Sequence, residues 1–552
     1  PNTPFKKGLD QGLDPTHPDR LVENVTAPSA GGFPGPDGEV RLRMRQPFRT
    51  ISAYRHTWGD RLGYWQKILP VWRGSVEVWG MARFFGWGWG APWVDGCDCQ
   101  GGGCCWEKAQ VSRMEATVLG GLDRFFGYTE RGSSFGTEVR AGTVTFLTMC
   151  YILFVNPDIL GAAGMPVADV AIATALGAAV GCILMGLLTD FPFALAPGMG
   201  INAFFTFTVV LGMGLSWQQA LGIVFIEGLL FMALSFLGAR EAALRSIPMS
   251  IKMATMTGIG LFLALVGMEK CGLVVANPAT LVSMGDLHDP SLLLSLGGLL
   301  LIGALMRRGV KGGILIGVLG VTAIAWISGL SPMPQQWIQL PSLPTETVFA
   351  MDFTGILSVT SLVVILSFFF VDFFDTAGTL IGVGRLSGLL DDEGHLPGAT
   401  RAFFADAVAT TAGACLGTSP VTSFVESAAG VEEGGRTGLT AVVVGLFFLG
   451  SLFFTPVFIA VPGIATAPAI IVVGTMMMHG ANDIPWGQLD ESLPAFLIII
   501  LMPFTYSITN GITIGIIAWV ILKVLTGKWR EISPVMACLA LLLCLYYAFV
   551  RG

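Results

Sequence analysis

Five carboxylates lie within long apolar stretches of the sequence, where ionisable side chains are costly and are retained mainly for function. They are Asp372, Asp375, Glu426, Glu227 and Asp406. A carboxylate withdrawn from water is a strong acceptor for N–H groups and can also carry a proton. The pattern therefore predicts a functional site inside an apolar medium.

These carboxylates are not equivalent. Asp372 and Asp375 are three residues apart and share a helix face. Asp375 lies among small residues, so we expect it to contact the ligand, whereas Asp372 is interpreted mainly as structural and as a third candidate for proton transfer beside Asp375 and Glu426. Glu426 directly follows the proline interruption of an apolar segment and is expected to contact the ligand. Glu227 and Asp406 are interpreted as pairing partners between buried helices.

Two short apolar segments, 198–212 and 421–432, are interrupted at corresponding positions. The first follows Ala-Pro-Gly at 196–198, and the second follows Thr-Ser-Pro at 418–420. A break inside a bilayer frees backbone N–H and C=O groups, which must be buried in protein or line a cavity. Interrupted segments in both halves of a chain are a strong indication of a transporter binding site, and proline kinks that serve only packing are the alternative.

The elements that must position these residues are membrane helices. Of the 552 residues, 53% are hydrophobic and 12% are charged, against about 25% charged in soluble domains, which excludes a soluble enzyme. Apolar stretches of spanning length recur along the chain. We expect fourteen segments, near 138–156, 168–190, 198–212, 216–238, 249–270, 291–307, 311–329, 355–385, 401–417, 421–432, 437–461, 466–480, 493–508 and 509–526.

The distribution of Lys and Arg predicts the orientation of these segments. Cytoplasmic loops retain positive charge, and the basic residues at the segment ends fall on the cytoplasmic side if the N-terminus is cytoplasmic. Lys270 is the exception. A further apolar run at 535–550 is expected to be a fifteenth span or an interfacial helix.

The sequence also resembles itself. Segments 1–7 and segments 8–14 look like two copies, and because seven is odd the copies must lie in opposite orientations, as in many secondary transporters. Shared membrane composition is the alternative explanation. We therefore divide the chain into a first repeat at 114–347, a second repeat at 348–530 and an apolar C-terminal segment at 531–552.

Residues 1–113 differ from the rest of the chain, because they are rich in Trp and Gly and show no sustained helical or alternating pattern of hydrophobic residues. We interpret them as a lineage-specific tail or a gene-model artefact, with Met114 as a plausible start. Their four clustered cysteines, at 97, 99, 104 and 105, lack the separated pairs of a zinc site. We expect no metal and no cofactor.

Several function classes are disfavoured. The sequence contains no H-E-x-x-H, G-x-S-x-G or P-loop motif, and its five histidines do not cluster. This pattern argues against an enzyme and against transport driven by ATP. A net charge of −7 argues against a partner nucleic acid, which would require a basic patch.

Taken together, the motifs closely resemble those of the AzgA-like purine permeases of the nucleobase/ascorbate transporter superfamily. The resemblance covers about residues 120–530. It is carried by T-E-V-R-A-G-T at 137–143, F-L-T-M at 146–149, Y-I-L-F-V-N-P at 151–157, A-P-G-M-G-I-N-A-F-F at 196–205, D-F-F-D-T-A-G-T at 372–379, G-T-S-P-V-T-S at 417–423, E-S-A-A-G-V at 426–431 and G-G-R-T-G-L-T at 434–440.

The resemblance implies an all-α polytopic fold of fourteen transmembrane segments in a 7+7 inverted repeat. A core domain of segments 1–4 and 8–11 would hold the substrate, and a gate domain of segments 5–7 and 12–14 would let the core move. Asp375 and Glu426 fall on the family's acidic positions and Phe204 on its aromatic position. Thr379 stands where related uracil carriers have a histidine, which argues against a histidine proton relay. Further expected substrate contacts are Asn202, Ala203, Thr422, Ser423 and Phe424.

The implied function is import of adenine, guanine and hypoxanthine, with cytokinins as substrates in plant members, by proton symport. Carboxylate acceptors and aromatic rings suit a flat purine with several N–H donors. We expect a homodimer in the lipid bilayer of the plasma membrane. The alternatives are an anion carrier of the related sulfate-transporter fold, a membrane-embedded enzyme and a non-transporting purine receptor.

Overall fold

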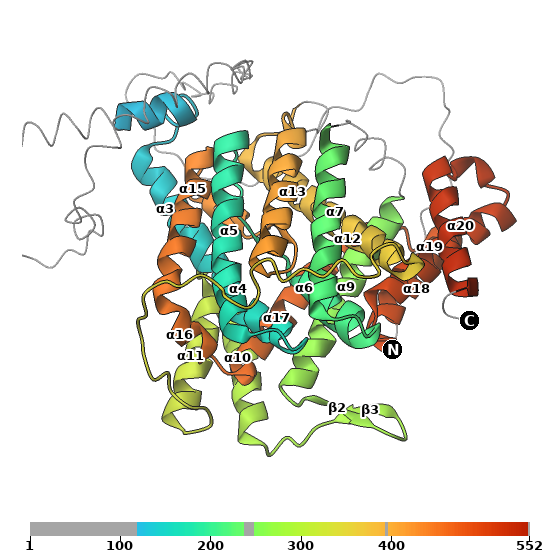
Figure 1. Cartoon of the computed structure of the whole chain (residues 1–552), viewed down its shortest axis with the longest axis horizontal. Coiled ribbons are helices and arrows are strands. Elements are labelled where there is room, and N and C mark those ends of the chain that lie inside the picture. The colour runs from blue at the N-terminus through green and yellow to red at the C-terminus, as the bar shows by residue number, and fades with distance from the viewer. Residues whose placement is uncertain (1–118, 237–247, 392–395, 550–552) are drawn as a thin grey trace, which may run out of the picture. The chain divides into compact units, whose positions relative to one another are not determined.

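The structure is a computed structural model that describes residues 119–236, 248–391 and 396–549. Most described residues are helical (Figure 1). The whole of the predicted tail, residues 1–113, with its cysteine cluster, lies outside the described residues.

Most of the helices of the first half correspond to the predicted apolar segments, and segment 1 is divided at Tyr151 into two helices. The helices are α3 (Phe135–Met149), α4 (Ile152–Gly161), α5 (Val167–Thr189), α6 (Met199–Ala203), the π-helix η2 (Phe204–Gly212), α7 (Trp217–Phe236), α9 (Met249–Lys270), α10 (Pro290–Arg307) and α11 (Gly313–Ile327).

The second half continues in the same way after a long connection. Its elements are α12 (Val359–Ser387), α13 (Ala399–Leu416), α14 (Ser427–Glu432), α15 (Gly438–Ser451), η3 (Leu452–Phe454), α16 (Thr455–Ile459), α17 (Gly463–Met477), η4 (Met478–Asp483), α18 (Leu489–Phe504), α19 (Ile508–Leu525), η5 (Trp529–Glu531) and α20 (Pro534–Phe549). Nine helical stretches among the described residues are long and apolar enough to cross a membrane. The predicted multi-pass helical membrane protein is therefore confirmed.

Local sequence sets several helix starts. Ser134, Ser358 and Thr437 each accept a hydrogen bond from a backbone N–H in the first turn of α3, α12 and α15. Asp289 does the same for α10, which begins at Pro290. Such caps satisfy N–H groups that have no partner within the helix.

The expectation of an all-α fold is wrong in two places. Strand β1 (Leu195–Pro197) pairs antiparallel with β4 (Val421–Ser423), and β2 (Val274–Asn277) pairs with β3 (Leu281–Met284) in a hairpin. The hairpin lies at the lower end of the helices in Figure 1. The physical reason for the first pair is that extended backbone at a proline break needs partners that lipid does not offer, and each broken segment supplies them to the other.

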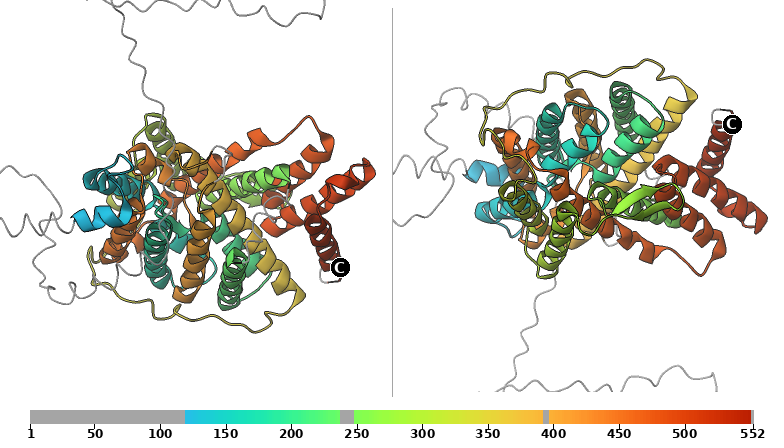
Figure 2. Two further views of the ribbon diagram at one scale, coloured as in Figure 1. Left: turned by 90° about the horizontal axis from the view of Figure 1, so that it is seen from above. Right: turned by 90° about the horizontal axis from the view of Figure 1, so that it is seen from below.

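The helices pack mainly within two sets. The first helix group contains α3–α7 and α12–α15, with extensive packing of α15 on α5 and of α13 on α7. The second helix group contains α9–α11 and α17–α19, with extensive packing of α9 on α17 and α18. Contacts between the groups are fewer and include α4 with α17 and α6 with α9. Figure 2 shows the C-terminal helices, in red, at one edge of the bundle.

A glycine pair allows one of the closest approaches. A Cβ atom on Gly438 would lie 2.0 Å from the carbonyl oxygen of Gly186, so α15 and α5 meet backbone to backbone only because neither position carries a side chain. Next to this contact, the buried Glu138 on α3 accepts hydrogen bonds from Arg436 N at 3.0 Å and Thr440 Oγ1 at 2.6 Å. Two of the sequence motifs therefore form one structural joint at the start of α15.

Candidate functional site

The two broken segments meet at their breaks. The register pairs Leu195 with Ser423 and Pro197 with Val421, and the pairing is extended by a hydrogen bond from Gly198 N to the carbonyl oxygen of Pro420 at 3.0 Å. Every residue of both strands is buried. The strand pair therefore forms a rigid crossing, which we call the β1–β4 crossing, in the interior of the first helix group.

Asp375 on α12 lies beside this crossing. A Cβ atom on Gly198 would lie 3.6 Å from Asp375 Oδ2 and 2.5 Å from Thr422 Cγ2. Only a glycine leaves room for α6 to begin next to the carboxylate and β4 at once. Three elements that are far apart in sequence, α6, α12 and β4, are thus brought together at Asp375.

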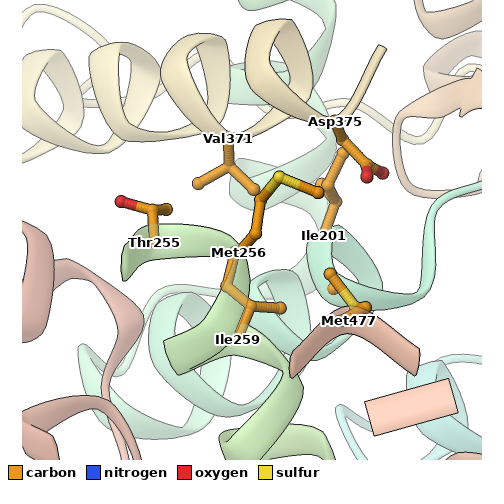
Figure 3. A pocket seen from close by; sticks show the side chains of 8 residues that line it. Ile201, Thr255, Met256, Ile259, Val371, Asp375 and Met477 are labelled. Atoms are coloured by element: carbon orange, nitrogen blue, oxygen red, sulfur yellow. The ribbon is translucent and has the colours of Figure 1, made fainter. Parts of the chain in front are cut away.

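A small cavity of about 10 Å³ opens at Asp375 between the two helix groups (Figure 3). The carboxylate is its one ionisable lining group. Its other lining residues come from α6, α9, α12 and α17 and are Gly200, Ile201, Thr255, Met256, Ile259, Val371 and Met477. The volume is about that of one water molecule, so the cavity is closed to a larger ligand in this arrangement.

Glu426 lies three residues after the end of β4 and immediately before α14. Tyr151, which is buried at the junction of α3 and α4, donates a hydrogen bond from its hydroxyl to Glu426 Oε1 at 2.5 Å. The Glu426 and Asp375 carboxylates are close enough for their charges to interact. Two acceptors therefore converge on one region, and one of them is held in place by a phenol.

The buried amide of Asn202 lies on α6, one turn after Gly198. Its Oδ1 accepts a hydrogen bond from Ser419 Oγ at 2.5 Å, which ties α6 to the loop before β4. Its Nδ2 has no hydrogen-bond partner among the described residues. A buried donor without a partner costs about 1–3 kcal/mol, so this amide is suited to a ligand that brings an acceptor.

A network of hydroxyl and carboxylate groups joins β4 to α12 and α13. Thr376 Oγ1 donates to Asp406 Oδ2 at 2.9 Å and lies 2.6 Å from Thr422 Oγ1. Ser423 Oγ also donates to Asp406 Oδ1 at 3.4 Å. The structure places Asp406, Thr422 and Ser423 in one buried network in which Asp406 links α13 to α12 and β4.

Asp372 faces a different neighbour from Asp375. It is fully buried, and Thr410 Oγ1 on α13 donates to its Oδ2 at 3.5 Å. Glu227 is fully buried on α7, which packs on α13. The structural roles of the two residues stay predictions.

Aromatic side chains of η2 and α12 are used largely for packing. Phe204 makes an edge-to-face contact with Phe368 on α12 at 4.6 Å between ring centroids. Phe373 stacks on Phe369 at 5.8 Å and on Phe403 at 5.6 Å. These two rings, together with Ala203, Thr379 and Phe424, are buried but do not line the cavity.

Sequence reasoning missed Tyr151 and the lining residues of the second helix group. Tyr151 lies within a quoted motif, and the one available signal was that a buried phenol requires a hydrogen-bond partner. Met256 and Met477 carried no signal, because methionine is a common filler of irregular gaps in apolar cores.

The sequence is similar to known membrane permeases. The Permease family model matches residues 136–514. The guanine/hypoxanthine permease PbuG of Bacillus subtilis (strain 168) is 46% identical over 441 residues, covering 78% of this chain and 100% of the relative. The adenine permease AdeP of Escherichia coli (strain K12) is 42% identical over 443 residues, covering 80% and 99%.

Solved structures show a similar fold at much lower identity. The transmembrane domain of the cyanobacterial bicarbonate transporter BicA matches with a TM-score of 0.53 and 15% identity, covering 68% of this chain and 97% of that domain. SLC26A9 matches with a TM-score of 0.53 and 12% identity, covering 79% and 73%. With a family model matched over most of its length and relatives above 40% identity, the chain belongs to the Permease family, as its motifs predicted.

Proposed function

We propose that this chain imports purine nucleobases and binds the base between Asp375 and Glu426 at the β1–β4 crossing. The observation that carries the proposal is the convergence of two carboxylates, one held by Tyr151, where two broken membrane segments meet. The names of the relatives, which are adenine and guanine/hypoxanthine permeases, support the same substrate class.

The donor and acceptor groups of the site suit a purine. Purines present several N–H donors, which carboxylates accept with strong, charge-assisted hydrogen bonds. They also present ring nitrogens as acceptors, and the free Nδ2 of Asn202 supplies a donor for one of them. The remaining predicted contacts lie on or next to α6, α12 and β4, and are Thr379, Thr422, Ser423, Ala203, Phe204 and Phe424.

Transport requires the closed cavity to open. A cavity of about 10 Å³ cannot admit a purine unless α9 and α17 move relative to α6 and α12. We infer that the first helix group is the core domain and the second is the gate domain of a fourteen-segment, 7+7 inverted repeat. The limited contact between the groups supports this division, because few interactions must break for one group to slide past the other.

The driving force is proposed to be the proton gradient. Carboxylates inside membrane segments are typical proton carriers, and Asp375, Glu426 and Asp372 are the candidates. The N-terminus is placed in the cytoplasm of a plasma-membrane protein, with the β2–β3 hairpin outside. Homodimer formation stays a prediction.

An anion carrier is the second candidate, because the bicarbonate transporter BicA has a similar fold. A similar fold at 15% identity does not identify the substrate. The charge of the site favours the purine, since neither Lys nor Arg lines the cavity and two carboxylates would repel an anion.

The test is uptake in cells that lack their own purine, uracil and sulfate carriers. We expect saturable uptake of labelled adenine, guanine or hypoxanthine, with little uptake of uracil or sulfate. Uptake should fall as external pH rises from about 5 to 8 and should collapse with a protonophore, because protonation of the carboxylates from outside drives inward movement. A strict sodium requirement without a pH response would exclude proton symport, and purine binding without flux would indicate a receptor.

A further inference from the structure

Lys270 is the basic residue that the charge pattern placed on the outer side, and the structure gives it a specific partner. Its Nζ lies 2.5 Å from Asp158 Oδ2 and 3.5 Å from the carbonyl oxygen of Asp158. Thr466 Oγ1 donates to the same Oδ2 at 2.5 Å. Asp158 is therefore held from two sides by one ammonium and one hydroxyl.

This cluster joins the two helix groups. Asp158 lies on α4 of the first group, whereas Lys270 ends α9 and Thr466 lies in the first turns of α17, both in the second group. The α4–α17 contact is one of the limited contacts between the groups. Breaking this cluster would therefore remove one of the contacts between the groups without disturbing the packing within either.

The cluster lies at the end of the helices that carries the β2–β3 hairpin, because β2 begins four residues after Lys270. A glycine starts α17 at this point, and a Cβ atom on Gly463 would lie 3.2 Å from Lys270 Cε and 3.9 Å from Asp158 Oδ1. The glycine thus lets α17 approach the ion pair closely. The side chains of Asp158 and Lys270 are each 24% exposed, so water can reach the pair when it separates.

A cavity of about 440 Å³ adjoins the ion pair, far larger than the one at Asp375. It is lined by Asp158 and Lys270 and by apolar residues that include Phe154, Phe458 and Val461. The ion pair thus adjoins the larger cavity, whereas the cavity at Asp375 is closed. This is the arrangement expected of a gate.

The opposite end of the molecule has a counterpart. Lys311, between α10 and α11 of the second group, lies 3.0 Å from Glu432 Oε2 and 3.5 Å from Glu433 Oε1 at the end of α14 in the first group. The Glu432 side chain is 62% exposed, so this pair is more open to solvent than the Asp158–Lys270 pair. Ion pairs between the groups at both ends are consistent with a closed central site.

We propose that Asp158, Lys270 and Thr466 form an outer latch that closes the hairpin end of the transport path and must open in each cycle. The proposal rests on the proposed transport function. The latch residues position the two groups and do not contact the substrate. Sliding of the first group would carry Asp158 away from Lys270 and Thr466, and their reunion would favour the outward-closed state.

Cross-linking tests whether the pair must separate. In a background in which the ten native cysteines are replaced and purine uptake is retained, Asp158→Cys and Lys270→Cys are combined and joined with a short, reducible bis-methanethiosulfonate reagent. We expect uptake to fall at least tenfold and to recover on reduction. The matched control joins Glu269→Cys with Tyr506→Cys, two hydrogen-bonded residues within the second group at the same end, and should keep its uptake.

A second measurement needs no transport. Val461→Cys places a thiol on the buried wall of the larger cavity. Adding Asp158→Asn should raise its labelling by a membrane-impermeant maleimide several-fold, because the outward-closed state loses its ionic contact. Unchanged labelling, or full uptake by the cross-linked protein, would overturn the latch. If the parent protein shows no purine uptake, the proposed function fails, and the labelling result still decides the latch.

Discussion

The contact between Tyr151 and Glu426 leads to a quantitative prediction. Tyr151→Phe removes one hydroxyl and keeps the ring, so packing at the α3–α4 junction is preserved. The lost hydrogen bond joins a phenol to a carboxylate at 2.5 Å, and bonds to charged groups contribute about 1.5–3 kcal/mol. Since about 1.4 kcal/mol is tenfold in affinity, purine binding should weaken by roughly 10- to 100-fold if Glu426 must be held in place to bind the base.

The assay combines initial uptake rates with purine binding to purified protein. The matched control is Tyr128→Phe, because the Tyr128 hydroxyl is also bonded, to the carbonyl oxygen of Leu119 at 3.0 Å, but lies outside the site. Tyr128→Phe should leave both measurements unchanged. Equal affinity and equal uptake in Tyr151→Phe and wild type, at equal membrane levels, would refute the view that Tyr151 positions Glu426.

Three further predictions concern charge. Asp375→Asn should abolish purine uptake without lowering membrane levels, because the amide keeps the shape of the side chain but not the charged acceptor. Asp372→Asn should mainly lower the yield of folded protein. Unchanged uptake by the Asp375→Asn variant would show that Asp375 does not belong to the site. Glu426→Gln should change the ratios of adenine, guanine and hypoxanthine uptake in competition assays, and a common scaling of all three would contradict base recognition by Glu426. Lys523→Met should lower the free energy of unfolding in detergent by about 3–5 kcal/mol, because buried Lys523 forms ion pairs with Asp490, Glu491 and Glu531 at 2.6–2.8 Å. Lys528→Met removes a more exposed lysine that pairs with Asp490 and should cost much less.

The general position of the site was predictable because broken segments and buried carboxylates are both expensive in lipid. Pro197 and Pro420 mark the breaks, and the sequence pattern placed Asp375 near them. The small residues around Asp375 led us to expect different roles for Asp372 and Asp375, and these roles stay predictions. Their three-residue spacing still leaves an angular difference of about 60° on a helix, which is enough to direct Asp372 to α13 and Asp375 to the crossing.

The remaining features depend on contacts between distant parts of the chain. The pairing of β1 with β4 joins residues more than two hundred positions apart, so no local pattern specifies it. Tyr151 and Glu426 are 275 positions apart. Met256 and Met477 line the cavity only because α9 and α17 pack beside α6 and α12, which hydropathy cannot indicate. The ring contacts of Phe204 with Phe368 on α12 and of Phe373 with Phe403 on α13 likewise depend on packing that no local pattern specifies.

The most direct test of the central claim is counterflow in liposomes that contain only the purified chain. Liposomes loaded with unlabelled hypoxanthine should transiently accumulate labelled hypoxanthine from outside, and external adenine or guanine should compete. Uracil and bicarbonate should not compete, and Asp375→Asn should abolish the accumulation. Absence of hypoxanthine counterflow from folded protein, or counterflow of bicarbonate in its place, would contradict a purine permease.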